Sequence, residues 1–265
     1  MKDVYIYCNW KIYLDDEQSE SLFRSILADL QSVNHYEKGP NINLTIFPAT
    51  SSLRSLSEIN SNSNFANKKL KISIGCQNIH YEKHGAFTGE TSIMSIQPYC
   101  TSVLVGHSER RNVFGEKNAD LNKKTSLIIN NDLEPIICIG EPENVSKNDA
   151  EAYLREQILS SIANIDISNQ VIFAYEPIGS IGTGFATETL DVNSKAEFIK
   201  DTLIQNFPDI DLRLIKILYG GSVNSENITD YLSLSNIDGV LIGSSSVVLE
   251  KFQMIIDKII SKSHI

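Results

Sequence analysis

The sequence predicts an α/β protein that folds as a single (β/α)8 barrel. Eight short apolar, β-rich runs recur along its 265 residues, and segments with helical spacing lie between them. Near-continuous apolar strands that alternate with helices are typical of a parallel sheet buried on both faces. Eight units of about 33 residues each match the usual size of this fold, which is about 250 residues. A doubly wound open sheet is the structural alternative.

The predicted strands are residues 4–10, 43–49, 71–78, 101–106, 134–140, 170–176, 214–220 and 237–243. Four segments between them have apolar residues at every third or fourth position, which indicates helices. They are residues 19–30, 119–130, 151–162 and 195–207. No Pro/Gly/Ser-rich linker separates two groups of strands, so we predict one domain over residues 1–265. Two polar, turn-forming segments, 31–43 and 60–69, are interpreted as surface insertions without assigned chemistry.

Composition and charge limit the partners and the compartment. The formal net charge is −10, and no run of Lys or Arg offers the basic face that nucleic-acid binding needs. No segment approaches the ~20 apolar residues of a spanning helix, and the N-terminal residues lack the apolar stretch of a signal peptide. The four cysteines form no CxxC motif and are expected to be buried, reduced thiols. We therefore predict a cytoplasmic protein with no nucleic-acid or membrane partner.

Candidate site residues follow the predicted strands, because barrel active sites lie at the carboxyl ends of the strands. The first strand ends in NWK, and alternation along a strand places Asn9 and Lys11 on the same side, with Trp10 turned away. Taken alone, this tripeptide is more typical of a solvated strand end. The sixth strand ends in AYEP, where Pro177 favours an extended backbone at Glu176. A carboxylate at this place can act as a general base or as an ion-pair partner.

The fourth strand ends in GHSERR, which places a histidine directly after a buried apolar run. We expect His107 to project into the barrel mouth and Ser108 to be the N-cap of a short helix that begins at Glu109. A helix N-terminus beside the ring favours a neutral imidazole, which donates a hydrogen bond at neutral pH. The other histidines are interpreted as solvent-exposed; they are His35, His80, His84 and His264.

The seventh and eighth strands end in runs of small residues, YGGSV (219–223) and DGVLIGSSS (238–246). Small side chains leave backbone N–H groups accessible, and the loops after these two strands commonly bind phosphate in barrels of this class. A tight turn would explain one such loop, but two in this order favour an anion site. This feature is shared by many barrel enzymes and does not by itself identify a reaction.

Nine motifs, in order along nearly the whole chain, resemble the triosephosphate isomerase family. They are NWK, GCQN, GAFTGE, GHSERR, CIGE, AYEP, IGTG, YGGSV and DGVLIG. The resemblance implies a TIM barrel that interconverts dihydroxyacetone phosphate and D-glyceraldehyde 3-phosphate in glycolysis and gluconeogenesis. It implies a cytoplasmic homodimer that acts on a small phosphorylated triose. The reaction removes a proton beside a carbonyl, so one base and preorganised donors suffice, without a metal or an organic cofactor.

The same resemblance implies a role for each matching residue. Glu176 is the base that shuttles a proton between two substrate carbons, and His107 is the neutral electrophile that polarises the carbonyl. Lys11 offsets the charge of the enediolate and the phosphate, Asn9 is a supporting donor, and Glu109 pairs with Lys11. Backbone N–H groups that bind the phosphate are assigned to Gly182, Ser222, Gly243 and Ser244.

The resemblance also implies a dimer in which the loop 80–90 docks into the neighbouring subunit. Thr88 at its tip then supports the neighbour's Asn9 and His107. Two alternatives to the main activity stay open. One is a related aldose–ketose isomerase for another small sugar phosphate, such as erythrulose phosphate, and the other is a non-catalytic homologue with a binding role.

The chain departs from the family pattern at four positions. Gly179 replaces a tryptophan, Ser180 an alanine and Phe185 a lysine, and Ser244 replaces the second glycine of a pair. The first three lie in the loop that closes over the site in this family. We expect a loop that closes less completely, because an added glycine raises the entropy cost of ordering and the indole anchor is lost. Lower turnover and more phosphate released as a by-product would follow.

Overall fold

The computed structural model describes residues 2–32, 37, 39–63, 65, 67–143, 145–167, 170–180 and 187–261. Within these residues the strands are β1 (Val4–Asn9), β2 (Ile42–Phe47), β3 (Leu70–Cys76), β4 (Ser102–Val105), β5 (Glu134–Ile139), β6 (Val171–Tyr175), β7 (Ile215–Tyr219) and β8 (Gly239–Ile242). All pair in parallel with their neighbours in sequence, and β8 pairs with β1 to close the barrel. The predicted (β/α)8 barrel is therefore confirmed, and the open-sheet alternative is wrong.

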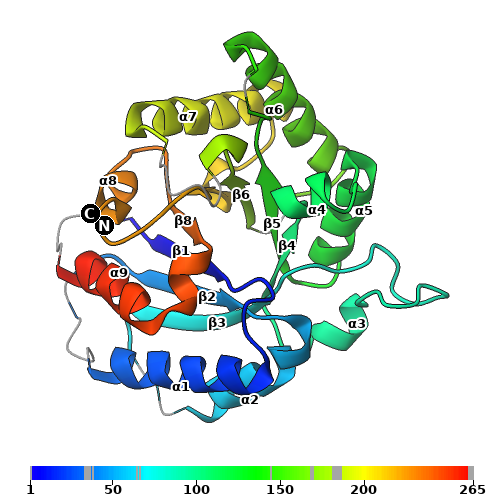
Figure 1. Ribbon diagram of the computed structural model, residues 1–265. Coiled ribbons are helices and arrows are strands. Elements are labelled where there is room, and N and C mark those ends of the chain that lie inside the picture. The colour runs from blue at the N-terminus through cyan, green and yellow to red at the C-terminus, as the bar shows by residue number, and fades with distance from the viewer. Residues whose placement is uncertain are drawn as a thin grey trace.

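Helices surround the barrel (Figure 1). They are α1 (Asp16–Ser32), α2 (Leu53–Asn62), α3 (Ile93–Ile96), α4 (Ser108–Asn112), α5 (Asn118–Ile129), α6 (Lys147–Ile162), α7 (Thr189–Asn206), α8 (Ile228–Leu232) and α9 (Leu249–Ser261). Four 3-10 turns, η1 (Thr50–Ser52), η2 (Ile178–Ser180), η3 (Leu212–Leu214) and η4 (Ser244–Val247), also lie in the connections. The four helical segments predicted from spacing overlap α1, α5, α6 and α7. None of the helices in the described part of the chain is both long and apolar enough to cross a bilayer.

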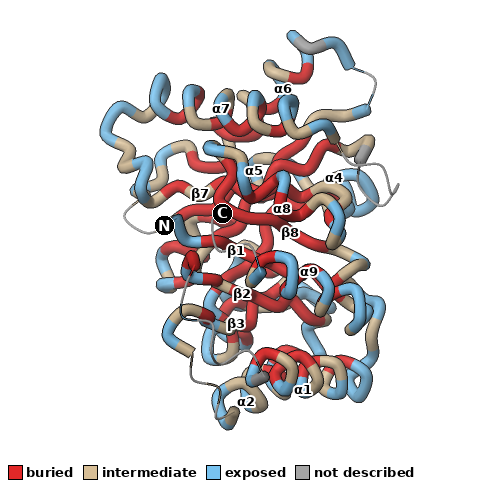
Figure 2. The backbone as a smooth tube through the Cα atoms, turned by 90° about the vertical axis from the view of Figure 1, so that its left-hand side faces the viewer, coloured by how far each residue is buried: buried red, intermediate tan, exposed pale blue. Residues whose placement is uncertain are grey.

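Side chains along the strands alternate between the barrel interior and the core under the helices, as a period of two requires. On β1, Tyr5 and Tyr7 fill the barrel interior, whereas Ile6 and Cys8 belong to the core between the barrel and its helices. Figure 2 shows the strands as a continuous buried centre inside a partly exposed shell of helices. The Tyr7 hydroxyl donates to Glu134 Oε1 at 2.6 Å, so the polar group of this interior ring is satisfied. Burial on both faces explains why the strands read as apolar runs.

The two segments interpreted as surface insertions are only partly irregular. α1 continues to Ser32 and α2 to Asn62, so the ends of these helices fall inside the ranges 31–43 and 60–69. Among the described residues, Lys69 Nζ donates to the carbonyl of Gly39 at 3.2 Å, which joins the two segments. Other residues of both segments lie outside the described part of the chain. The assignment of residues 1–265 to one domain stays a prediction.

Candidate active site

A cavity of about 250 Å³ lies at the carboxyl ends of the strands. Its lining includes four predicted site residues that come from three strand ends, Asn9, Lys11, His107 and Glu176. Small residues after β7 and β8 also line it; they are Gly220, Gly221, Ser222, Gly243, Ser244 and Ser245. The barrel therefore gathers residues that are up to 236 positions apart, from 9 to 245, into one hollow.

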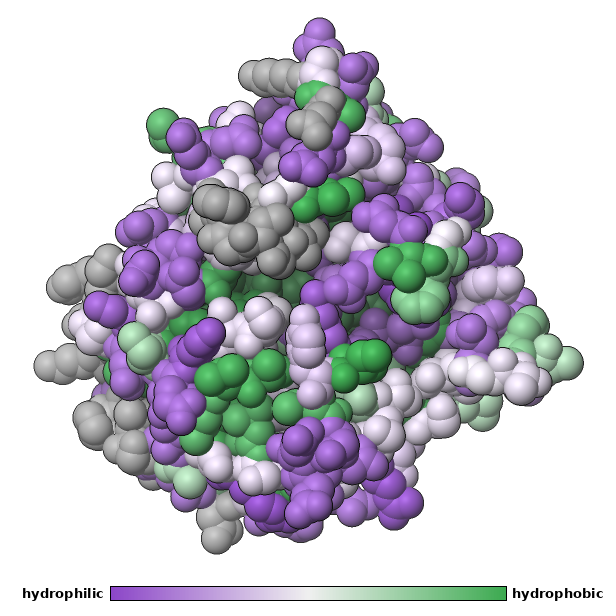
Figure 3. All heavy atoms as spheres, viewed as in Figure 1, coloured by the Kyte–Doolittle hydropathy of each residue, from purple (hydrophilic) through white to green (hydrophobic). Residues whose placement is uncertain are grey.

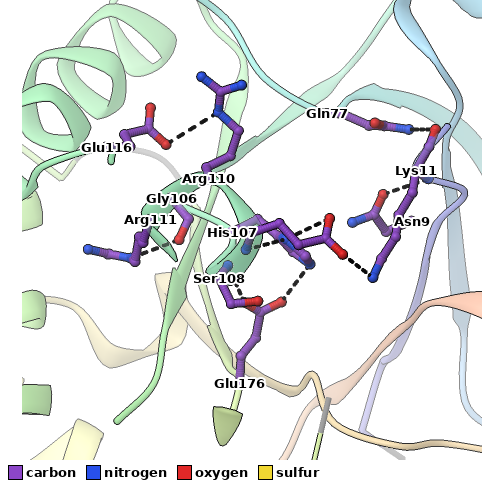
Figure 4. Close-up of polar contacts among 11 residues, drawn as sticks. Asn9, Lys11, Gln77, Gly106, His107, Ser108, Arg110, Arg111, Glu116 and Glu176 are labelled. Carbon is purple, nitrogen blue, oxygen red and sulfur yellow. Dashed lines mark hydrogen bonds and ion pairs between the residues drawn. The ribbon is translucent and has the colours of Figure 1, made fainter. Parts of the chain in front are cut away.

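Lys11 is held in an unusual backbone conformation just beyond the end of β1. Its φ of 51° lies in the left-handed region, which side-chain-bearing residues adopt only when their surroundings compensate the strain. Asn9 Oδ1 accepts from the Lys11 N–H at 3.0 Å, and Gln77 Nε2 donates to the Lys11 carbonyl at 2.7 Å (Figure 4). Two side chains thus bind both backbone polar groups of Lys11. Its ammonium pairs with Glu109 Oε1 at 2.6 Å, which is the contact expected from the resemblance.

His107 forms the N-cap of α4. The prediction that Ser108 is the cap is therefore wrong. The Glu109 N–H donates to His107 Nδ1 at 3.3 Å, and Ser108 is the first residue of the helix. An Nδ1 that accepts a hydrogen bond leaves the ring proton on Nε2 of a neutral imidazole. The carboxylate of Glu109 lies 3.6 Å from Nδ1, which is beyond hydrogen-bonding distance.

The carboxyl group of Glu176 is buried and bound from two sides. Its Oε1 lies 3.2 Å from His107 Nε2, and its Oε2 accepts from the backbone N–H of Ser108 at 3.0 Å (Figure 4). The main-chain N–H of Glu176 donates to the Ile139 carbonyl at 2.7 Å, which continues the pairing of β6 with β5. A first-turn N–H of α4 therefore orients the same carboxylate that faces the proton-bearing nitrogen of the ring.

Two glycines are required beside this carboxylate. A Cβ added to Gly140 would lie 1.9 Å from the Glu176 carbonyl oxygen, and one added to Gly220 would lie 2.8 Å from Glu176 Cγ. Both distances are below van der Waals contact, so neither position has room for a side chain. The main chain of the neighbouring strand ends thus packs directly against the acid.

The interior of the barrel supplies a neutral neighbour to Glu176. Burial, and then the nearby Glu176 carboxylate, raise the pKa of the Cys138 thiol well above its ordinary value, so the thiol stays protonated. The guanidinium group of Arg111 binds two main-chain carbonyl groups. Its Nε donates to the Gly106 carbonyl at 2.8 Å, and a terminal nitrogen donates to the Cys138 carbonyl at 3.1 Å. These contacts tie the ends of β4 and β5 together beneath the site.

Three of the predicted phosphate residues, Ser222, Gly243 and Ser244, line the same cavity as His107. Gly243 and Ser244 are at the start of η4, where the first N–H groups have no partner within the turn, and Ser222 follows β7. Asn227 Nδ2 donates to the Ser222 carbonyl at 3.1 Å and fixes the course of this loop. Gly182, the fourth predicted phosphate contact, lies outside the described residues.

The structure describes only some of the four positions that depart from the family pattern. Gly179 lies in η2, and a Cβ added there would lie 3.2 Å from Glu143 Cγ. Ser244 lines the cavity at the position where the resemblance leads us to expect a glycine. Phe185 lies outside the described residues, as does the side chain of Ser180.

A second cavity of about 350 Å³ adjoins the first and shares Asn9, Lys11 and His107 with it. Ile12 and Phe114, which also line it, are 88% and 66% exposed, respectively. The loop 82–90 is exposed throughout and projects from the body of the barrel between β3 and α3 (Figure 1). Thr88 lies in this projecting loop and lines neither cavity. Figure 3 shows several apolar patches on this face of the molecule, among hydrophilic surface.

The described parts of the chain contain neither a cluster of metal-binding side chains nor a disulfide bond. No group of three or more His, Cys, Asp or Glu residues is placed there to hold a metal ion. All four cysteines are free and buried, as predicted; they are Cys8, Cys76, Cys100 and Cys138.

Sequence reasoning missed several side chains that shape the site. Gln77 holds the Lys11 carbonyl, and only its place in the GCQN motif drew attention to it. Tyr219 and Tyr231 bind the backbone of Thr187, which lies beyond the loop that follows Glu176. No local pattern signals these contacts, because each joins residues more than thirty positions apart.

Comparisons with known proteins agree on one family. The family model described as "Triosephosphate isomerase" matches residues 4–259. A triosephosphate isomerase of Dictyoglomus thermophilum is 35% identical, with 97% of this chain and 99% of that protein covered. One from Finegoldia magna is 36% identical, with the same coverage of both chains.

Structural similarity extends over the same length. The crystal structure of triosephosphate isomerase from Bartonella henselae superposes with a TM-score of 0.80 at 27% identity, covering 96% of this chain and 98% of that one. The match thus includes the barrel and every strand end that forms the cavity. With the family model matching residues 4–259 and relatives more than 30% identical over nearly their full length, the chain belongs to the triosephosphate isomerase family.

Proposed function

We propose that the protein interconverts dihydroxyacetone phosphate and D-glyceraldehyde 3-phosphate through an enediolate. The observation that carries this proposal is the pairing of a buried carboxylate, Glu176, with the proton-bearing nitrogen of His107, at 3.2 Å and inside a small cavity. A base and a neutral donor that face the same space can take a proton from one carbon while a carbonyl oxygen is polarised.

In this mechanism Glu176 removes the proton from the carbon beside the carbonyl group and returns it to the neighbouring carbon. The Ser108 N–H holds one carboxylate oxygen, so the other is directed into the cavity. His107 donates from Nε2 to the substrate oxygen on which charge develops, because the Glu109 N–H occupies Nδ1. A positioned base of this kind accelerates a reaction by roughly 10² to 10⁴.

Lys11 supplies the positive charge of the site. Its ammonium lies next to Glu109, and its backbone is fixed by Asn9 and Gln77, so the cation is placed before substrate binds. We assign the phosphate to the part of the cavity lined by the residues after β7 and β8, where Ser222, Gly243 and Ser244 have small side chains and can offer backbone N–H groups. Gly182 completes this set as a prediction.

The direct test is a coupled isomerase assay on three- and four-carbon ketose and aldose phosphates. We expect turnover of dihydroxyacetone phosphate, with erythrulose 4-phosphate converted more slowly. Preferred turnover of the four-carbon substrate would instead support the related aldose–ketose isomerase, since Ser244 alters the cavity wall. Binding of both compounds without turnover of either would support the non-catalytic reading.

We also propose that the protein acts as a homodimer in the cytoplasm, with no nucleic-acid or membrane partner. The support is a projecting loop that carries Thr88, together with a cavity beside the catalytic residues that is edged by exposed Ile12 and Phe114. Removing such apolar surface from water favours association. The shared lining at Asn9, Lys11 and His107 would let one subunit order the site of the other.

A charged substitution in the loop tests the dimer. Thr88→Arg is expected to shift the sedimentation coefficient from that of a dimer to that of a monomer and to lower turnover. Ser21→Arg, at an exposed position of α1, is the matched control and should change neither. A wild-type protein that sediments as a monomer at micromolar concentration would contradict the proposal.

A further inference from the structure

Two segments that line the catalytic cavity begin where the pairing of β7 with β8 ends. The register of these two strands stops at Tyr219 and Val240. The segment 220–227 follows β7, and the segment 243–247 follows β8. Both contain predicted phosphate contacts. A phosphate group bound by both segments therefore needs a distance between them that the sheet itself does not set.

One side chain joins the two segments directly. The Ser245 hydroxyl donates to the Val223 carbonyl at 3.1 Å, across 22 positions of the chain. Both residues line the catalytic cavity. A serine hydroxyl carries one proton, so the proton of Ser245 is used for Val223 and is not offered to a ligand. Ser245 can therefore act on the substrate through the segment after β7.

The segment after β7 is also held by a side chain of its own. Asn227 Nδ2 donates to the Ser222 carbonyl at 3.1 Å, and Asn227 Oδ1 accepts from the Asn224 N–H at 2.9 Å. The peptide unit between Val223 and Asn224 is thus bound at both ends, its carbonyl by Ser245 and its N–H by Asn227. Because a peptide unit is planar, these two bonds fix its orientation.

The segment after β8 is ordered by a buried serine. The backbone N–H and the hydroxyl of Ser246 both donate to the Gly243 carbonyl, at 2.9 and 2.7 Å. The next N–H along the chain, that of Ser244, points away from this carbonyl, because the C=O and N–H of a trans peptide unit point in opposite directions. Each segment is therefore ordered within itself, and Ser245 fixes one segment relative to the other.

We propose that Ser245 is a positioning residue for the phosphate group of the substrate, because its hydroxyl sets the distance between the segments after β7 and β8. Hydrogen bonds from N–H groups to oxygen form over a narrow range of about 2.7–3.2 Å, so donors on two segments serve one phosphate only at the right separation. A contact that is made before binding also reduces the ordering that binding requires. The inference rests on the proposed function and adds Ser245 to the residues on which phosphate binding depends.

Ser245→Ala removes this contact and leaves the backbone of both segments unchanged in sequence. We expect KM for dihydroxyacetone phosphate to rise about three- to tenfold, which is the usual effect of one lost hydrogen bond, with kcat within about twofold of wild type. The inhibition constant of inorganic phosphate, used as a competitor, should rise by the same factor. Glyceraldehyde has the carbonyl group but no phosphate, so its deuterium exchange in D2O should keep the wild-type rate.

Ser55→Ala is the matched control. The Ser55 hydroxyl also donates to a main-chain carbonyl at 3.1 Å, that of Ser52, and it is half-buried like the hydroxyl of Ser245. Ser55 lies in α2 and does not line the catalytic cavity. We expect a wild-type KM and a wild-type inhibition constant for phosphate in this variant, even if its melting temperature falls as much as that of Ser245→Ala.

Three results would overturn the proposal. They are a wild-type KM and phosphate inhibition constant in Ser245→Ala, an equal rise of both constants in Ser55→Ala, and an equal loss of glyceraldehyde exchange in Ser245→Ala. If the wild-type protein has no isomerase activity, the proposed function fails separately. Calorimetric titration with inorganic phosphate then decides the inference, which is refuted if the wild-type protein binds no phosphate or if Ser245→Ala binds it equally well.

Discussion

Gly220→Ala should displace the catalytic base while leaving the substrate-binding groups in place. The new Cβ would lie 2.8 Å from Glu176 Cγ and 3.3 Å from the Tyr175 carbonyl oxygen. Non-bonded carbon atoms prefer about 3.5–4.0 Å, so Cγ must move by about 0.7 Å or more. The carboxylate cannot follow freely, because the Ser108 N–H and His107 already hold its two oxygens.

A misplacement of this size has a large effect on the chemical step and a small one on binding. A shift of about 1 Å at a reacting group costs on the order of 10²-fold in rate, and overpacking a buried site costs about 1–3 kcal/mol of stability. We therefore expect kcat of Gly220→Ala to fall by about 10²-fold, with KM changed by no more than about threefold. The atoms nearest to the added Cβ belong to Glu176 and Tyr175 and not to the predicted phosphate contacts, so we expect substrate binding to be retained.

The assay is steady-state isomerisation well below the melting temperature, with Gly75→Ala as the control. A Cβ at Gly75 would lie 2.2 Å from the Phe47 ring, so this variant also overpacks the barrel but touches no carboxylate. It should lose stability and keep kcat within about twofold of wild type. Wild-type kcat in Gly220→Ala, or an equal loss in Gly75→Ala, would refute the argument that packing against Glu176 sets the rate.

Three further predictions concern the loop, the ion pair and the barrel interior. Gly179→Trp restores the family's residue and should raise turnover and lower phosphate release, provided that Glu143 moves from its 3.2 Å approach; no change in either would contradict it. Glu109→Gln should lower kcat/KM about threefold in low salt and less in high salt, since it removes the partner of Lys11; equal losses at both ionic strengths would argue against this reason. Burial raises the pKa of Glu134, so the folded chain binds the carboxyl proton more tightly than the unfolded chain. The free energy of unfolding therefore falls as pH rises from the ordinary pKa of a glutamate to the raised one. Glu134→Gln should remove that fall in urea unfolding, and a gain confined to acidic pH would contradict the sign.

The sequence predicted the barrel because strands that are buried on both faces consist mainly of apolar residues. Each strand reads as an apolar run, and the polar residues that follow the runs fall at one edge of the closed sheet. Alternation brought Asn9 and Lys11 to the same cavity, although Lys11 lies past the strand in a left-handed backbone that alternation does not describe. Sequence motifs thus located the site but not its local geometry.

What the sequence could not supply are contacts between remote side chains. Ser108 looked like the helix cap because serine is a common N-cap, but the ring of His107 takes that place and releases the Ser108 N–H to bind Glu176. Gln77 reaches Lys11 across 66 positions, and Tyr231 reaches Thr187 across 44. Such pairs are set by the closure of the barrel, and no local rule of propensity or spacing contains that information.

The most direct test of the account is exchange of solvent deuterium into the substrate, because it reports proton transfer at carbon. The account predicts that the wild-type protein in D2O places deuterium on the carbon beside the carbonyl during isomerisation. Glu176→Gln should lower that exchange by about 10²- to 10⁴-fold while the protein still binds a phosphate-bearing inhibitor. Exchange at the wild-type rate in Glu176→Gln would show that another group is the base and would contradict the central claim.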